Sequence, residues 1–173
     1  MSRPSLAQAH SWRPGTLLEL ADRWDVVAAA LGGSADRFGA DLDRSRQWWS
    51  GAAADAASAR GGLVRDAMTA LARALVTAAV AARDGAEQLG RARSVVLAYV
   101  DEAEQEGFAV SGDATVTLAA DPAPLMVLLA GGDEAAAMVL LRTRAAEWQQ
   151  RISAALDQLG DADDDAAADI ADA

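Results

Sequence analysis

Cysteine and lysine are both absent from this 173-residue chain, and histidine occurs once, at His10. Without cysteine there is no disulfide framework, no thiolate metal site and no cysteine nucleophile. His10 lies in a polar lead with no carboxylate or nucleophile in a fixed relation to it, and a catalytic or metal site needs groups that are held rigidly. We therefore expect no catalytic residue, no metal site and no cofactor, and we predict that the protein is not an enzyme.

Basic charge is also scarce, with 15 basic residues against 26 acidic ones and a formal net charge of −11. This surplus of acid opposes binding to nucleic-acid phosphates and to anionic membranes. The longest apolar stretches, Ala74–Ala82 and Pro124–Ala130, fall short of the roughly 20 residues of a membrane-spanning helix. Residues 1–15 lack the apolar core of a Sec signal peptide. We expect no nucleic-acid partner, no membrane span and a cytoplasmic protein whose export, if any, follows another route.

Alanine, by contrast, makes up about a quarter of the chain. It has the highest helix propensity of all residues but buries little area, so the scattered larger side chains must supply most of the core. Heavy use of alanine, arginine, glycine and aspartate without lysine is typical of GC-rich coding, which points to an actinobacterial source. The composition therefore favours a helical protein.

Apolar residues follow a helical spacing on both sides of Trp48–Gly51. In the first segment, after a flexible lead over 1–15, they recur every seven positions, at Leu17, Trp24, Leu31 and Phe38. Such a row is typical of a helix packed along another helix. A second row runs from Gly61 to Ala103 without a proline, with Leu71 and Leu75 near its middle, and predicts one helix over about 52–106. The short turn between the helices makes them antiparallel.

The lengths of these helices call for a third one. At 1.5 Å per residue the first spans about 50 Å and the second about 80 Å, so the second needs further cover. A helical pattern over 133–160 suits that role, packing on the second helix. Residues 107–132 contain a β-hairpin pattern, Phe108–Leu118, and then a Pro/Gly connection. The acidic run in 161–173 lacks the glycine and terminal glutamate of a calcium loop and is expected to be a solvated tail.

The predicted fold is therefore all-α: an elongated antiparallel helical hairpin, extended by a third helix into a bundle, with a small β-hairpin at one tip. At the tip between the first two helices stands Trp49-Ser50-Gly51. With this Trp-x-Gly turn between two heptad-patterned helices, residues 16–106 resemble the WXG superfamily of type VII (ESX) secretion substrates and related leader domains.

The resemblance implies a module that binds other proteins. Its hairpin would pair with another helical hairpin, as a hetero- or homodimer, and would present the turn to export machinery such as a secretion ATPase or chaperone. The residues expected to carry this binding are Trp49, Gly51, Trp48, Leu71 and Leu75.

One feature departs from the family. Its export signal is Tyr-x-x-x-Asp/Glu after the second helix, whereas Tyr99 is followed four residues later by Ala103. The signal would then come from a partner or from a downstream region, or the protein is not secreted. Two other interpretations stay open: a stand-alone structural bundle whose Trp-x-Gly is only a turn, and the N-terminal leader of a catalytic effector domain. The weak alanine-rich segment after the acidic run ends mid-pattern at Ala173, as expected of a fragment of something longer.

Overall fold

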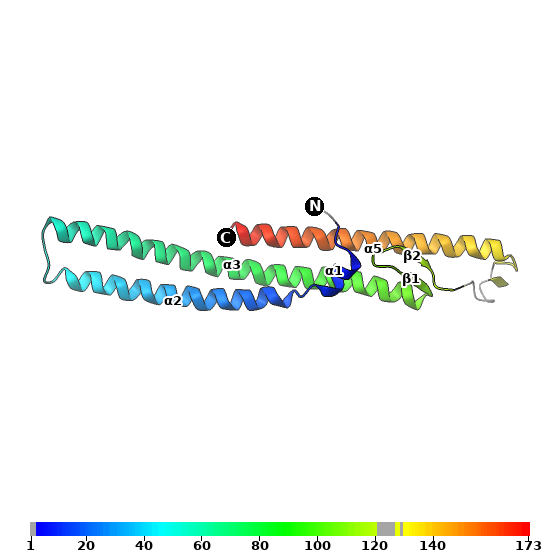
Figure 1. Cartoon of the computed structure of the whole chain (residues 1–173), viewed down its shortest axis with the longest axis horizontal. Coiled ribbons are helices and arrows are strands. Elements are labelled where there is room, and N and C mark those ends of the chain that lie inside the picture. The colour runs from blue at the N-terminus through cyan, green and yellow to red at the C-terminus, as the bar shows by residue number, and fades with distance from the viewer. Residues whose placement is uncertain (1–2, 121–126, 129) are drawn as a thin grey trace. The chain divides into compact units, whose positions relative to one another are not determined.

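The computed structural model describes residues 3–120, 127–128 and 130–173 (Figure 1). These residues are mostly helical, with one small antiparallel sheet, which confirms the predicted all-α class and the short strand pair. The elements are α1 (Leu6–Ser11), α2 (Gly15–Ser45), α3 (Ala52–Gln105), β1 (Phe108–Val110), β2 (Val116–Leu118) and α5 (Glu134–Ala171). Strands β1 and β2 pair with Ala109 opposite Thr117. The predicted chain-breaking prolines Pro122 and Pro124 lie outside the described residues.

The chain divides into two compact units. One, which we call the hairpin unit, comprises residues 15–86 and 166–173. The other, the strand unit, comprises residues 1–14 and 87–165. Helices α3 and α5 each contribute residues to both units.

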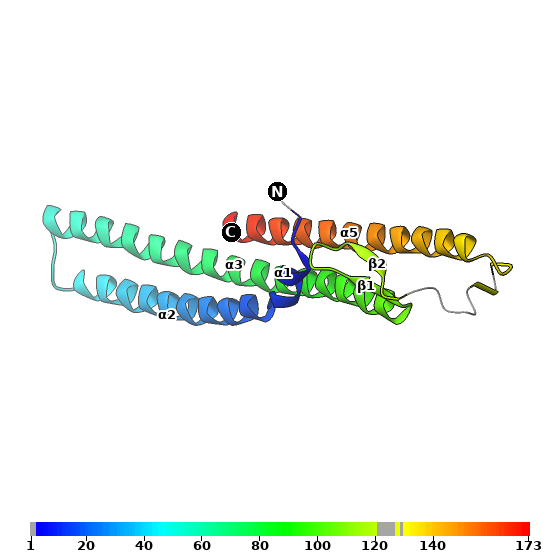
Figure 2. The ribbon, with the colours of Figure 1, turned by 45° about the vertical axis from the view of Figure 1, so that its right-hand side comes forward.

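In the hairpin unit, α2 and the first part of α3 lie side by side in opposite directions, as both views show (Figures 1 and 2). The most deeply buried residues of α2 are small: Ala21, Ala28, Ala35 and Gly39. The larger residues predicted to form the packed row, such as Leu17, Trp24 and Leu31, are only half-buried. The predicted row of larger residues therefore lies on α2 but is only partly covered. The row of alanines, Ala21, Ala28 and Ala35, is buried more deeply.

Glycines mark the places of closest approach. A Cβ added at Gly61 of α3 would lie 2.6 Å from Cδ1 of Leu42 in α2. Across the same pair of helices, the Arg83 guanidinium donates hydrogen bonds to Asp22 at 2.8 Å and to Asp25 at 2.6 Å. Small residues thus allow contact between the helices, and an ion-paired arginine ties their exposed edges.

The end of the chain corrects the prediction of an acidic tail over 161–173. Helix α5 continues to Ala171, eleven residues past the predicted end of the third helix at 160. Ala166 is buried, and Ile170 packs against a cluster of Ala21, Ala79 and Ala82. The acidic residues favour a solvated tail, but alanine and isoleucine at a helical spacing bury one side of this segment against the hairpin.

The predicted flexible lead is also wrong over residues 6–11. Ser5 caps α1 in a reciprocal pair of hydrogen bonds with Gln8, a capping box. Leu6 and Ala9 are buried, and Arg93 of α3 donates to the carbonyl oxygen of Ala9 at 2.8 Å. A short helix in a polar segment is therefore held by burial and by an arginine from α3.

We expect Gly85→Ala to weaken the packing of residues 166–171 within the hairpin unit. A Cβ at Gly85 would lie 2.7 Å from the Cβ of Ala166, and neither atom can move by a side-chain rotation. Overpacking of this kind costs about 1–3 kcal/mol, against a gain in helix propensity of about 1 kcal/mol. Hydrogen exchange should become faster in residues 166–171. The control is Gly90→Ala, also in α3, where a Cβ meets nothing within 4 Å; equal exchange in both variants would contradict the packing.

Candidate protein-binding surface

The turn between α2 and α3 positions the predicted Trp-x-Gly residues. The amides of Trp48 and Trp49 both donate to the carbonyl oxygen of Ser45, at 3.3 and 3.0 Å, which closes the end of α2. Gly51 then adopts a positive φ of 102°, and its carbonyl accepts from the amide of Asp55 in the first turn of α3. This positive φ is the reason for glycine at position 51. Lack of space is not, since a Cβ there would meet no atom within 4 Å.

Both indoles of this turn reach solvent. Trp48 is 78% exposed and Trp49 is 44% exposed. Trp49 lines a shallow hollow of about 360 Å³ together with Arg46, Asp55 and Ser58. Two adjacent tryptophans in solvent are unusual for a turn whose only task is to join two helices, since tryptophan is enriched at the centres of protein–protein interfaces.

A second exposed apolar group lies on α3. We call it the α3 stripe, and its members are exposed residues at helical spacing: Ala57, Leu63, Val64, Ala67 and Leu71. Leu63, Val64 and Leu71 are 72%, 49% and 53% exposed. Leu71, which the sequence places in the apolar row and among the residues expected to bind a partner, is on the surface of this chain, whereas Leu75 of the same row is half-buried.

Charge is sparse along this stripe. At 100° per residue, Arg65, Asp66 and Arg73 fall on the opposite half of α3. Arg60 is the one charged residue whose helical position falls within the stripe. The result is an apolar helix face of the kind that marks an interaction site when it is contiguous.

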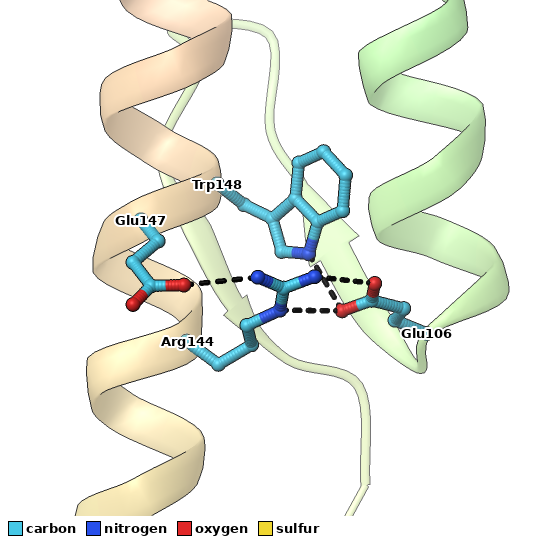
Figure 3. A network of polar contacts seen from close by, with 4 residues as sticks. All are labelled: Glu106, Arg144, Glu147 and Trp148. Atoms are coloured by element: carbon cyan, nitrogen blue, oxygen red, sulfur yellow. Dashed lines mark hydrogen bonds and ion pairs between the residues drawn. The ribbon is translucent and has the colours of Figure 1, made fainter.

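The strand unit holds a polar network on a different part of the chain, seen in Figure 3. Arg144 of α5 donates two hydrogen bonds to Glu106, at 2.8 and 2.7 Å, and the indole N–H of Trp148 donates to the same carboxylate at 2.8 Å. The guanidinium groups of Arg144 and Arg151 lie 5.0 and 5.1 Å from the Trp148 ring centre. Trp148 is 2% exposed, so this network surrounds one of the largest buried side chains.

Glu106, directly after α3, is a residue that the sequence analysis did not single out. Glu106 accepts hydrogen bonds from Arg144 and Trp148, and these lower the pKa of its carboxyl group from 4.5 to about 2. The partners lie about 40 residues away in sequence, so no local pattern pointed to them. Tyr99 also packs in this region, with its ring centre 6.3 Å from that of Trp148.

The remaining candidate residues do not gather into a site of their own. His10 lies exposed in the last turn of α1, and its carbonyl oxygen accepts a hydrogen bond from Arg93 at 3.1 Å. Asp161–Asp165 are part of α5. Among the residues that the structure describes, no three His, Asp or Glu side chains come together as a metal site. Within the same residues, every helix is too short or too polar to cross a bilayer.

Comparison with known proteins adds no relative. No protein-family profile matches the chain, and neither the curated proteins nor the solved structures contain a match.

We expect Gly51→Ala to cost about 1–2 kcal/mol of unfolding free energy, because an L-residue is strained at this positive φ. The matched control is Gly62→Ala, within α3, where a Cβ also meets nothing within 4 Å. That change should be neutral or stabilising by up to about 1 kcal/mol. Chemical denaturation of both variants measures the difference, and equal unfolding free energies would contradict a strained turn.

We expect the Glu106 network to lose its contribution to stability in acid. The folded-state pKa of about 2 lies below the ordinary 4.5, so the stabilisation is complete above pH 4.5 and is lost as the pH falls toward 2. Thermal midpoints of wild type and Glu106→Gln should differ at pH 6, and the difference should shrink as the pH falls from 4.5 toward 2. Other carboxylates titrate alike in both proteins, so a constant gap between the two would contradict the network.

Proposed function

We propose that this chain is a non-enzymatic protein-binding module of the type VII (ESX) secretion kind. In this proposal the hairpin unit pairs with another helical hairpin through the α3 stripe and presents the Trp48–Gly51 turn to the export machinery. The observation that carries it is the exposure of Trp49 and Trp48 at the tip of a helical hairpin, together with Leu71 and Val64 on one of its faces.

The physical support is that Trp48 and Trp49 are exposed to solvent in the single chain. Neither tryptophan of the turn is among the buried residues, and the most deeply buried residues of α2 are alanine and glycine. Exposed aromatic and branched apolar residues gain free energy only when another surface removes them from water. A binding partner would supply that surface.

The export signal is proposed to come from a partner or from a region outside this sequence. Tyr99, the only tyrosine, is half-buried and packs near Trp148, and Ala103 stands where the family has an acidic residue. A protein that lacks its own signal can still be exported as one half of a signal-bearing pair.

A structural bundle is the alternative, in which Trp49 only finishes the turn. An effector leader is compatible with either reading, since a catalytic domain would lie outside this sequence. Loss of binding without loss of stability on removal of the Trp49 indole separates the binding module from the bundle.

We expect Trp49→Ala to keep the thermal midpoint within a few degrees of wild type, because truncation of a partly exposed side chain at a turn costs about 1 kcal/mol or less. The same variant should lower export, or capture of the secretion ATPase, in the native host. Trp148→Ala is the contrasting variant: this tryptophan is buried, and its truncation should cost about 3–5 kcal/mol. A large stability loss for Trp49→Ala with normal export of the folded fraction would favour the structural bundle.

A further inference from the structure

Residues 3–12, which we call the strap, contact parts of the strand unit that are far apart in the sequence. Arg93 of α3 donates to the carbonyl oxygen of Ala9 in the strap, at 2.8 Å. The amide of Leu6 donates to the carbonyl oxygen of Gly112, in the turn between β1 and β2, at 3.2 Å. The strap is therefore held by α3 and by the turn of the small sheet.

Helix α5 adds a notch and a carboxylate to this surface. Pro4 is buried, and a Cβ added at Gly160 would lie 3.1 Å from its Cδ atom. Glycine lowers the stability of a helix relative to alanine, so the close approach of Pro4 gives a physical reason for glycine at this position. Arg3 donates two hydrogen bonds to the carboxylate of Asp157, both 2.6 Å long. We call the surface under the strap the strap groove, and it comprises Arg93, Gly112, Asp157 and Gly160.

The strap depends on this groove for its own structure. Its helix α1 has six residues, and isolated helices shorter than about 12–15 residues are marginal in water. Leu6 and Ala9 are 4% and 0% exposed, although one and a half helical turns have no core of their own. A released strap therefore loses its helix, and it returns to the groove as a linear segment that folds on binding.

The cover that the strap provides is incomplete. A hollow of about 480 Å³ lies between it and α5, lined among others by Trp12 of the strap and Asp164 of α5. The side chains of Arg3 and Asp157 are 48% and 50% exposed, and solvent screens an ion pair of this kind. The strap is held by a few buried side chains and hydrogen bonds, so it can open while the long helices stay folded.

The charge around the groove favours a basic segment. Residues 87–165 contain five arginines and fifteen acidic residues, a net charge of −10, whereas the strap contributes the guanidinium of Arg3. Opposite charges steer a segment to its site and fix its register more than they add to its affinity. With Arg3 on Asp157, Pro4 meets the notch at Gly160 and the next two buried positions are Leu6 and Ala9. The groove therefore selects the pattern Arg-Pro-x-Leu-x-x-Ala.

We propose that the strap groove is a binding site for a partner segment of the pattern Arg-Pro-x-Leu-x-x-Ala, and that the strap closes it from within the same chain. The strap is then an autoinhibitory contact, because a partner segment binds only where the strap has left. Its apparent affinity falls in proportion to the fraction of chains whose strap is open. This site involves neither the α3 stripe nor the Trp48–Gly51 turn, so it goes beyond the proposed function.

The first test asks whether the strap opens as one unit in the full chain. The amides of Leu6 and Trp12 donate to the carbonyl oxygens of Gly112 and Gln8, so both are protected while the strap is closed. Hydrogen exchange should give them one protection factor, at least about a hundredfold below that of Ile152 in α5. Unequal protection of the two, or protection equal to that of Ile152, would overturn a strap that opens on its own.

The second test measures binding of a fluorescent peptide of residues 3–11 to the full chain by anisotropy. Leu6→Asp opens the strap, because a charge is not tolerated at a position that is 4% exposed, and it leaves the groove unchanged. This variant should bind the peptide at least about tenfold more tightly than wild type. Arg3→Glu changes no buried side chain and should bind about threefold more tightly, which keeps the test decisive where Leu6→Asp does not fold.

Two controls locate the binding site. Gly160→Leu, added to either open variant, fills the place of Pro4 and should abolish binding. Gly90→Leu is the matched change on α3, where a Cβ meets nothing within 4 Å, and should leave the affinity unchanged. Equal affinity for wild type and the open variants would overturn the autoinhibitory strap. Absence of binding to every variant, or binding that survives Gly160→Leu, would overturn the groove as the site.

Discussion

The close approach of α2 and α3 through small residues is the constraint on which the hairpin unit depends. Ala21, Ala28 and Ala35 are buried at intervals of seven, and Gly61 has no room for a Cβ beside Leu42. Small side chains contribute little area each, so stability must come from many contacts along a long helix pair rather than from a few large residues. Within the hairpin unit, α3 supplies such contacts over residues 52–86 without interruption.

The small residues between α2 and α3 also explain why the positions of the helices could be predicted from the sequence, whereas the burial of single residues could not. The positions of α2, α3 and the strand pair could be predicted because period-7 rows, the absence of proline and the Trp48–Gly51 break are local signals. The burial of each residue could not be predicted. A repeat of apolar residues every seven positions does not tell whether the large or the small residue of each turn faces the neighbouring helix. Leu71 belongs to the predicted row and is 53% exposed in the single chain.

The misread ends of the chain have a related cause. Asp161–Asp165 suggested a solvated segment, and the composition of residues 1–15 suggested a flexible lead. Burial of Ala166 and Leu6 depends on surfaces supplied by distant segments, and a sequence window contains no information about those surfaces. The candidate surface was found in part: Trp49 and Gly51 follow from their spacing, whereas Leu63 gave no signal, and the pairing of Glu106 with Arg144 spans 38 positions.

Small residues in the core and large ones outside also change what a partner can do. When two helices of one chain pack through leucine side chains, the same leucines would have to contact a binding partner. Partner binding then competes with folding. Here Ala28 and Ala35 make the internal contact, whereas Leu71 and Val64 remain free. The hairpin can therefore fold first and offer a complete apolar face afterwards. Removal of an exposed side chain then weakens association while the free energy of unfolding of the single chain stays nearly the same.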